Sequence, residues 1–249
     1  MKMQLHFSIM SLTLIGFGFL SASRIIDVKH DFVKIDNNLF TSRHEVTNAE
    51  YNEFLKSLLN EQQWDDHAIC IYDSTQWLKK LSNAETKPLA LSYHSNKRYD
   101  NYPIVNITAD GAYGYCRWLT EKYNNNPKRK YKKVIFRLPS EQEWMKMIAN
   151  DTKNSTHNNY NIKTKNQSNG IYDHVSDGGL FTTASSQYKP NNKGVFDVIG
   201  NVAEITAEGY LKGGSWDNEF AECSSEKRQN YNLPDPRVGF RIFMEILEK

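Results

Sequence analysis

Apolar residues recur along this chain at the spacing of an amphipathic helix in three separate places. The first run follows Thr47 and Glu50, which stand three residues apart as in a capping box. The second follows Thr108, and the third follows Ser140 and Glu143, which form another capping-box pattern. The three apolar faces consist of Tyr51, Phe54, Leu55 and Leu58; of Ala112, Tyr115, Cys116 and Leu119; and of Trp144, Met147 and Ile148. We therefore predict three helices that each bury one face.

Alternating apolar residues predict short strands. Residues 32–35 alternate, and a strand is expected to end at Pro139. Val238, Phe240 and Ile242 also alternate, which predicts one closing strand near the end of the chain.

Two long stretches lack a clear period. Residues 62–99 are irregular, with two tryptophans and scattered charge, and we expect a loop with short elements there. Residues 150–193 are rich in Asn, Ser, Thr, Lys and Gly. A loop of that length inside a compact domain needs another source of order, and a bound cation would supply it.

The first 23 residues have the parts of a secretory signal. Lys2 precedes a mostly apolar run over residues 7–20, and small residues follow at 21–23. We predict a signal peptide at residues 1–23, a domain at 24–249, and export to the periplasm, the cell surface or the medium. An uncleaved N-terminal anchor is the alternative, although the run is short for a membrane span. No later stretch is long and apolar enough to span a membrane.

Length, charge and cysteines narrow the choice of function. A chain of 249 residues suits one domain with a sizeable core, and the net charge of +2 gives no reason to expect a nucleic-acid partner. The cysteines are Cys70, Cys116 and Cys223, and an odd number leaves at least one without a partner in the chain. Cys116 lies on a predicted apolar helix face, so we expect it to act as a small core residue.

The region from residue 196 to residue 243 contains most of the candidate chemistry. Asp197 and Glu204 flank a Gly200-Asn201 turn whose carbonyl groups can point inward. Carboxylate and carbonyl oxygens together are the ligands that calcium prefers. Farther on, residues 213–216 read Gly-Gly-Ser-Trp, and the glycines allow the backbone to approach another group closely.

These motifs resemble the formylglycine-generating enzyme family, also called sulfatase-modifying factors. The family's G-N-V-W-E-W-like turn, G-G-S-W and closing G-F-R correspond here to residues 200–205, 213–216 and 239–241. Residues 45–54, 102–119 and 136–144 match earlier family segments, so the resemblance covers residues 32 to 243. It implies a single α+β domain of the formylglycine-generating enzyme type, related to the C-type lectin fold. We expect little regular secondary structure, mostly antiparallel short strands and long calcium-ordered loops.

The resemblance also implies two structural calcium ions. One would be held by the side chains of Asp197 and Glu204 and the carbonyls of Gly200 and Val202. The other would be held by Asn161, Ile162, Asp177 and Gly179. Neither ion would be catalytic.

The family's enzymes oxidise a substrate cysteine in a C-x-P-x-R motif to formylglycine, with oxygen and a copper(I) ion held by two cysteines. In this chain the corresponding positions are Asn218 and Cys223, so the first thiolate is missing. An amide is a poor copper(I) ligand, so we do not expect formylglycine synthesis unless Cys70 folds into the site and replaces the missing thiolate. If the protein were active, Cys223 and Ser215 would be its catalytic residues. The scattered histidines do not match the iron-dependent sulfoxide synthases of the same family.

Three functional hypotheses follow from the resemblance. The first is an exported, non-catalytic module that binds a protein, peptide or glycan, or belongs to a surface, secretion or gliding-type assembly. Its binding groove would be lined by Ser215, Trp216, Cys223 and Arg237. The second is a copper-dependent formylglycine-generating oxidase with Cys223 as its only thiol. The third is a buried Cys223 beside a vestigial groove. We prefer the first hypothesis, in which the protein is not an enzyme.

Overall fold

Short helices and strands alternate through the residues that this computed structural model describes, namely 26–81, 86–148, 160–165, 168, 170, 172–173 and 179–249. The helices are α1 (Val28–Asp31), α2 (Asn48–Asn60), α3 (Trp64–Cys70), α4 (Gln76–Lys80), α5 (Thr86–Ser92), α6 (Ala109–Asn124) and α7 (Glu141–Ile148), with 3-10 turns η1 (Lys97–Tyr99) and η3 (Phe220–Glu222). The strands are β1 (Phe32–Lys34), β2 (Leu39–Ser42), β3 (Lys133–Arg137), β4 (Thr164–Lys165), β5 (Tyr172–Asp173), β6 (Ala203–Ile205), β7 (Tyr210–Lys212), β8 (Gln229–Asn230), β9 (Val238–Gly239) and β10 (Phe243–Glu248). This is the α+β class that the sequence predicts.

The predicted helix starts are confirmed. Thr47 and Glu50 form a reciprocal capping box at α2, and the Thr108 hydroxyl accepts from the Gly111 amide at α6. At α7 the Ser140 amide donates to Glu143 at 2.8 Å, and the Glu143 amide donates to the Ser140 hydroxyl at 3.2 Å. Each helix turns its predicted apolar face inward, and Cys116 is buried as expected.

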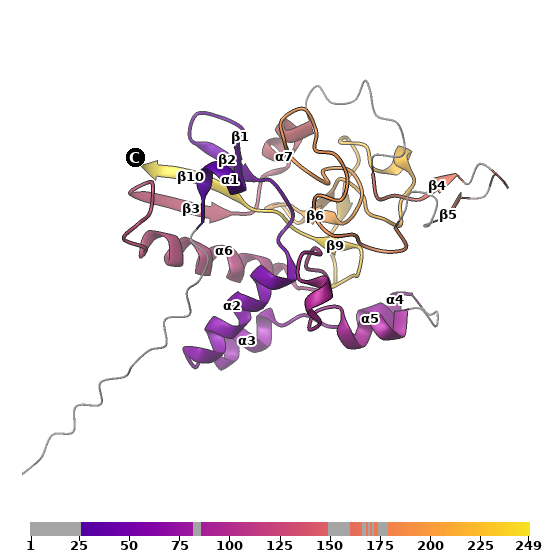
Figure 1. Cartoon of the computed structure of the whole chain (residues 1–249), viewed down its shortest axis with the longest axis horizontal. Helices are drawn as coiled ribbons and strands as arrows, with labels where there is room; N and C mark the ends of the chain where they lie inside the picture. Colours follow the sequence, from indigo (N-terminus) through magenta and orange to yellow (C-terminus); the bar gives the residue numbers. More distant parts are fainter. Residues whose placement is uncertain are drawn as a thin grey trace, which may run out of the picture.

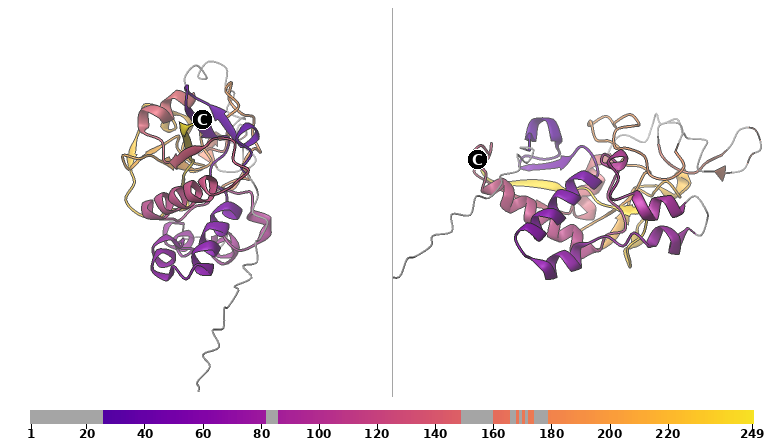
Figure 2. Two further views of the ribbon diagram at one scale, coloured as in Figure 1. Left: turned by 90° about the vertical axis from the view of Figure 1, so that its left-hand side faces the viewer. Right: turned by 60° about the horizontal axis from the view of Figure 1, so that its bottom comes forward.

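A four-stranded antiparallel sheet forms one layer, in the order β1-β2-β10-β3. Strand β10 lies between β2 and β3, so residues 243–245 pair with residues 39–41, about 200 positions earlier in the chain. Helix α6 packs along this sheet beneath β3, and α2 and α3 form a further layer beyond α6 (Figures 1 and 2). The largest apolar core lies between these layers and includes Phe54, Tyr115, Phe136 and Phe240.

A second sheet, β8-β7-β6-β9, supports the candidate site. Its β6 pairs in parallel with β9, and this pairing corrects the prediction of one closing strand. Val238, Phe240 and Ile242 are all buried, as their alternation indicates. The strand nevertheless breaks after Gly239, because β9 pairs with β6 while β10 belongs to the first sheet.

The irregular stretch 62–99, where we expected a loop with short elements, folds largely into the short helices α3, α4 and α5. Trp77 and Tyr93 from this stretch are buried in a separate apolar cluster together with Trp216. Across the described parts of the chain, no helix has the length and apolarity that a membrane crossing requires. The predicted signal at residues 1–23 lies outside the described residues.

Candidate functional site

Two consecutive glycines bring the backbone against Cys223. Gly213 and Gly214 follow β7 with φ values of 87° and 69°, in the left-handed region. A Cβ atom on Gly214 would lie 3.0 Å from both Cα and Cβ of Cys223 and closer still to its sulfur. Only glycine allows this approach, so the motif's second glycine serves to pack the turn onto the thiol.

The Cys223 thiol is enclosed and neutral. Its residue is 1% exposed, and Sγ lies 3.5 Å from the Glu219 carbonyl oxygen, to which it donates. Burial, followed by the negative charge of Glu222, raises the pKa of the Cys223 thiol to about 12. A metal ligand or nucleophile at this position would have to be the thiolate, which is not the stable form here near neutral pH.

Asn218 caps the turn beside Cys223. Its side-chain oxygen accepts hydrogen bonds from the main-chain amide and the hydroxyl of Ser215, both at 2.9 Å. Its amide group points to Glu222 at 3.4 Å. Residue 218 therefore organises the polypeptide and offers no soft ligand. With one protonated thiol and one amide, these two positions do not fit copper(I).

Cys70 does not replace the missing thiolate. It ends α3 in the main core, where its sulfur packs against Gly114 of α6. Cys223 instead packs against Gly214 in the glycine turn. The described cysteines are all free and buried.

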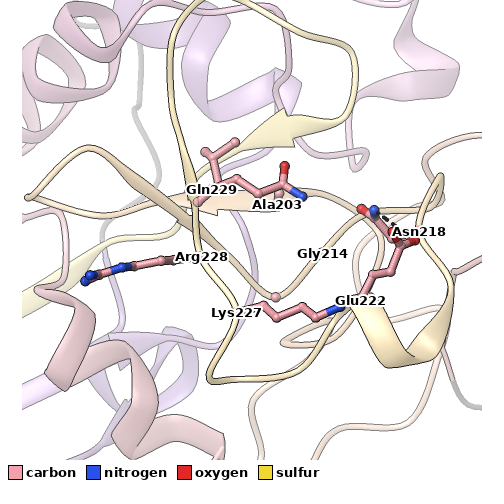
Figure 3. A pocket seen from close by; sticks show the side chains of 9 residues that line it. Ala203, Gly214, Asn218, Glu222, Lys227, Arg228 and Gln229 are labelled. Carbon is pink, nitrogen blue, oxygen red and sulfur yellow. Dashed lines mark hydrogen bonds between the residues drawn. The ribbon is translucent and has the colours of Figure 1, made fainter.

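A shallow pocket with a cavity volume of about 20 Å³ opens in front of the glycine turn (Figure 3). Ala203 of β6 contributes to its lining, together with Gly213 and Gly214, which directly follow β7. The Lys227 side chain extends toward Glu222, whose carboxylate turns to the Asn218 side chain (Figure 3). The remaining lining residues are Leu211, Asn218, Arg228 and Gln229.

The sequence predictions did not include most of this pocket. Only Ala203 could have indicated the pocket from the sequence. It stands where the family motif has a tryptophan, and a small side chain there leaves space. Lys227 and Gln229 are exposed and belong to no motif. Arg228 also reaches Glu141, at 3.0 Å, and lies over the Tyr210 ring.

The predicted groove residues lie mostly under the surface. Trp216 is 1% exposed, and its indole nitrogen donates to the Pro236 carbonyl at 3.3 Å. Ser215 is buried as well. Arg237 is partly exposed, but it pairs with Asp235 at 2.8 Å and with Asp217 at 2.9 Å. These contacts give the three residues structural roles, and the open surface lies at the neighbouring pocket.

The turn predicted to bind calcium is tightly built. Asp197, Gly200 and Asn201 all have positive φ, with values between 53° and 77°. A side chain on Gly200 would collide with the Asn161 carbonyl oxygen, which accepts from the Asn201 amide at 2.8 Å. Residues from the two predicted calcium sites therefore lie next to each other in the fold.

The calcium ligands differ in how well they fit. Both carboxylate oxygens of Glu204 accept from the buried Arg241 guanidinium, and one also accepts from the Trp144 indole at 2.7 Å. Its lone pairs are thus directed at N–H groups, and Glu204 does not fit as a metal ligand. Asp197 accepts from the Ser186 amide on one oxygen, and burial raises the pKa of its carboxyl to about 6. Its other oxygen makes it a suitable ligand.

The other predicted calcium site is only partly described. Asn161, Ile162 and Gly179 are buried, and Asp177 lies outside the described residues. The Asn161 amide donates to the Phe181 carbonyl at 2.8 Å and to the Asn201 side chain at 3.0 Å. Calcium binding at both sites stays a prediction.

Glu45 is a buried acid that the sequence predictions did not single out. It is 1% exposed, and one of its oxygens accepts from the Asn201 amide at 3.1 Å. Burial, and next the nearby Asp197 carboxylate, raise the pKa of Glu45 well above its usual range. Within the described ranges, no three His, Cys, Asp or Glu side chains converge as a metal cluster. Any cation here would need main-chain or neutral side-chain oxygens as well.

The fold and this site together define an α+β domain of the formylglycine-generating enzyme type. Residues 19–246 match the sulfatase-modifying factor enzyme 1-like domain, and the chain belongs to that family.

Two relatives by sequence are similar to much of the chain. The serine/threonine-protein kinase pkn1 of Chlamydia pneumoniae is 22% identical over 84% of this chain. The inactive C-alpha-formylglycine-generating enzyme 2 of Bos taurus is 26% identical over 56% of it. The matches span only 33% and 49% of those proteins' own lengths.

Three solved structures share the fold. PvdO from Pseudomonas aeruginosa superposes with a TM-score of 0.54 at 20% identity, covering 83% of this chain and 80% of that one. CarF gives 0.54 at 16% identity, with coverage of 84% and 86%. Treponema denticola variable protein 1 gives 0.53 at 17% identity, with coverage of 86% and 91%.

Proposed function

We propose that this protein is a non-catalytic member of the sulfatase-modifying factor family that acts as an exported binding or structural module. The observation that carries the proposal is the state of the two copper positions. Asn218 is a turn cap and Cys223 is a buried, protonated thiol. Neither group can hold copper(I) as it stands, so the oxidase chemistry of the family lacks its metal site.

The comparisons give further support. A relative at 26% identity is described as an inactive formylglycine-generating enzyme. Loss of activity therefore has a precedent in a protein that is similar to this one over 56% of the chain.

The pocket in front of the glycine turn is the proposed binding surface. The hollow itself is small, but its rim combines glycine backbone with lysine, glutamate and two amide side chains, which suits hydrogen bonding to a peptide or a glycan that lies across the surface. Calcium would order the loops around residues 161 and 197 without taking part in chemistry. Export through the signal at residues 1–23 would deliver the module to an extracytoplasmic assembly.

A peptide-conversion assay tests the absence of catalysis. The protein is incubated with copper(I), air and a peptide containing C-x-P-x-R, and mass spectrometry follows conversion of the peptide cysteine to the aldehyde. We expect no conversion by the wild-type protein. Copper-dependent conversion that disappears in Cys223→Ser would contradict the proposal and make Cys223 catalytic. Asn218→Cys is the matched comparison, because it restores only the missing thiol.

Peptide and glycan arrays test the binding role. We expect a ligand of the wild-type protein to be lost or weakened at least tenfold in Lys227→Glu. Lys193→Glu provides the matched control, since it makes the same charge change at an exposed lysine that does not line the pocket. Equal binding by both variants would place the ligand elsewhere on the molecule.

A further inference from the structure

Three carboxylates and one guanidinium are buried together behind the Gly200 turn. Glu204 and Arg241 bond to each other, and this pair carries no net charge. Glu45 and Asp197 lie close enough to act on the same guanidinium. Neither of them forms an ion pair with a lysine, arginine or histidine in the described part of the chain. Two carboxyl groups are therefore buried without a bonded cation.

Glu45 also carries an oxygen atom that lacks a hydrogen-bond partner among the described residues. Its Oε1 accepts from the Asn201 side chain, while Oε2 is fully buried and unpartnered. A proton on Oε2 would make it a donor, and that donor would be equally unpaired. Buried polar atoms are almost always satisfied, so this oxygen indicates a partner that the described residues do not supply.

Two neutral side-chain oxygen atoms near Glu45 are also buried without a hydrogen-bond partner from the residues that the structure describes. The Asn48 side-chain oxygen and the Ser185 hydroxyl are buried without a partner among the described residues. The main-chain amides of these two residues donate to the consecutive carbonyls of residues 101–102, each at 2.9 Å, which holds the segments side by side. The main-chain amide of the following residue, Ser186, donates to the Asp197 carboxylate at 3.1 Å.

We propose that the acidic ligands of the cation site in this chain are Glu45 and Asp197, in place of the pair Asp197 and Glu204, and that the site takes a hard divalent cation of the calcium class. Such a cation prefers oxygen ligands, and its double charge balances the two carboxylates. Glu204 is already committed to Arg241 and Trp144. The inference rests on the calcium binding proposed above and changes the residues that provide it.

Calcium titration of Glu45→Gln tests this assignment. Glutamine keeps the Oε1 acceptor for Asn201 and removes only the charge. The melting temperature and the calcium affinity by calorimetry are measured with calcium alone, starting from protein treated with a chelator. We expect the wild-type melting temperature to rise saturably with calcium. Glu45→Gln should lose that rise and bind calcium at least tenfold more weakly.

Two further variants make the result specific. Glu53→Gln removes a charge from a partly exposed glutamate on α2, and we expect it to respond to calcium like the wild type. Asp197→Asn should lose the response as Glu45→Gln does. In chelator, Glu45→Gln should melt at or above the wild-type temperature, because it replaces a buried carboxyl group, whose ionised form burial and Asp197 disfavour, with a neutral amide.

Each contrary result has its own meaning. Wild-type affinity in a folded Glu45→Gln would overturn the assignment of Glu45 while leaving calcium binding in place. A wild-type protein that does not respond to calcium would overturn calcium binding as a whole. Neither result depends on the peptide-conversion assay, which tests catalysis separately.

Discussion

One residue changes the chemistry of the glycine turn. At position 218 an amide oxygen accepts two hydrogen bonds from Ser215, where the family's enzymes have a cysteine. An amide is a hard, neutral acceptor, while copper(I) selects soft thiolates. In this chain residue 218 is therefore a structural cap of the glycine turn. The buried, protonated state of Cys223 agrees with this role.

Glycine at position 214 is required by the approach of Cys223. We expect Gly214→Ala to lower the free energy of unfolding by roughly 2–4 kcal/mol, because it combines a positive φ with a collision. Gly209→Ala is the matched control, since Gly209 has a φ of 78° but open space around it. That variant should lose only about 1–2 kcal/mol. Urea denaturation of both variants measures the difference, and equal losses would show that the contact with Cys223 does not matter.

At the scale of elements, the long helices are set by local signals at their starts. The α2 capping box satisfies main-chain donors at both Thr47 and Glu50, since Thr47 accepts from the Glu50 amide and Glu50 accepts from the Thr47 amide. The N-cap residue of the short helix α4, Thr75, makes no side-chain cap hydrogen bond. Its position is instead set by tertiary packing, since Trp77 is fully buried in the cluster with Tyr93 and Trp216. This contrast explains why the helix starts at Thr47 and Thr108 were predictable and those of residues 62–99 were not.

The α2 cap provides a test at this scale. We expect Thr47→Ala to cost about 1 kcal/mol of stability, since it removes the side-chain half of the capping box. Thr75→Ala, at the N-cap of α4, should change stability by less than about 0.5 kcal/mol, because its hydroxyl makes no cap bond to the helix and donates only to the Asp73 carboxylate at an exposed position. Chemical denaturation measures both values. A loss at Thr75 as large as that at Thr47 would contradict the proposed role of the cap.

For the whole molecule, His94 couples folding to pH. It is buried and stacked on Tyr72 with ring centroids 3.9 Å apart, and its Nε2 lies 3.0 Å from the Val105 carbonyl oxygen. Burial lowers the pKa of His94 to about 4 from 6.5. Because the folded state disfavours the charged ring, the stability contributed by His94 is present above pH 6.5. It is lost as the pH falls toward 4, by about 3 kcal/mol at about 1.4 kcal/mol per pKa unit.

The variant His94→Gln separates the contribution of His94 to the pH dependence of stability from those of the other titratable groups. We expect His94→Gln to be less stable than the wild type at pH 7, through the lost stacking, but to lose less stability between pH 6.5 and 4. The surface variant His30→Gln should keep the wild-type profile, since the His30 side chain is 77% exposed. Denaturation curves across this pH range provide the measurement. Parallel profiles for wild type and His94→Gln would show that His94 does not titrate with folding.

The sequence by itself determined the family, the α+β class, three helices with their buried faces and the presence of Asn218 at a position that the resemblance assigns to a cysteine. These features depend on residues close together in the chain, such as Ser140 with Glu143, or on the order of short motifs. Local hydrogen bonds and periodic burial leave a direct pattern in the sequence. The predicted strand at residues 32–35 likewise appears as β1.

Only the tertiary structure decided which groups meet across long separations. Glu45 reaches Asn201, and Glu204 pairs with Arg241, through contacts that no local spacing indicates. The break between β9 and β10 depends on two different sheets, and the burial of Trp216 depends on the helices of residues 62–99. The physical reason is that an ion pair or a strand pairing depends on the partner, and the partner is chosen by the packing of the whole core.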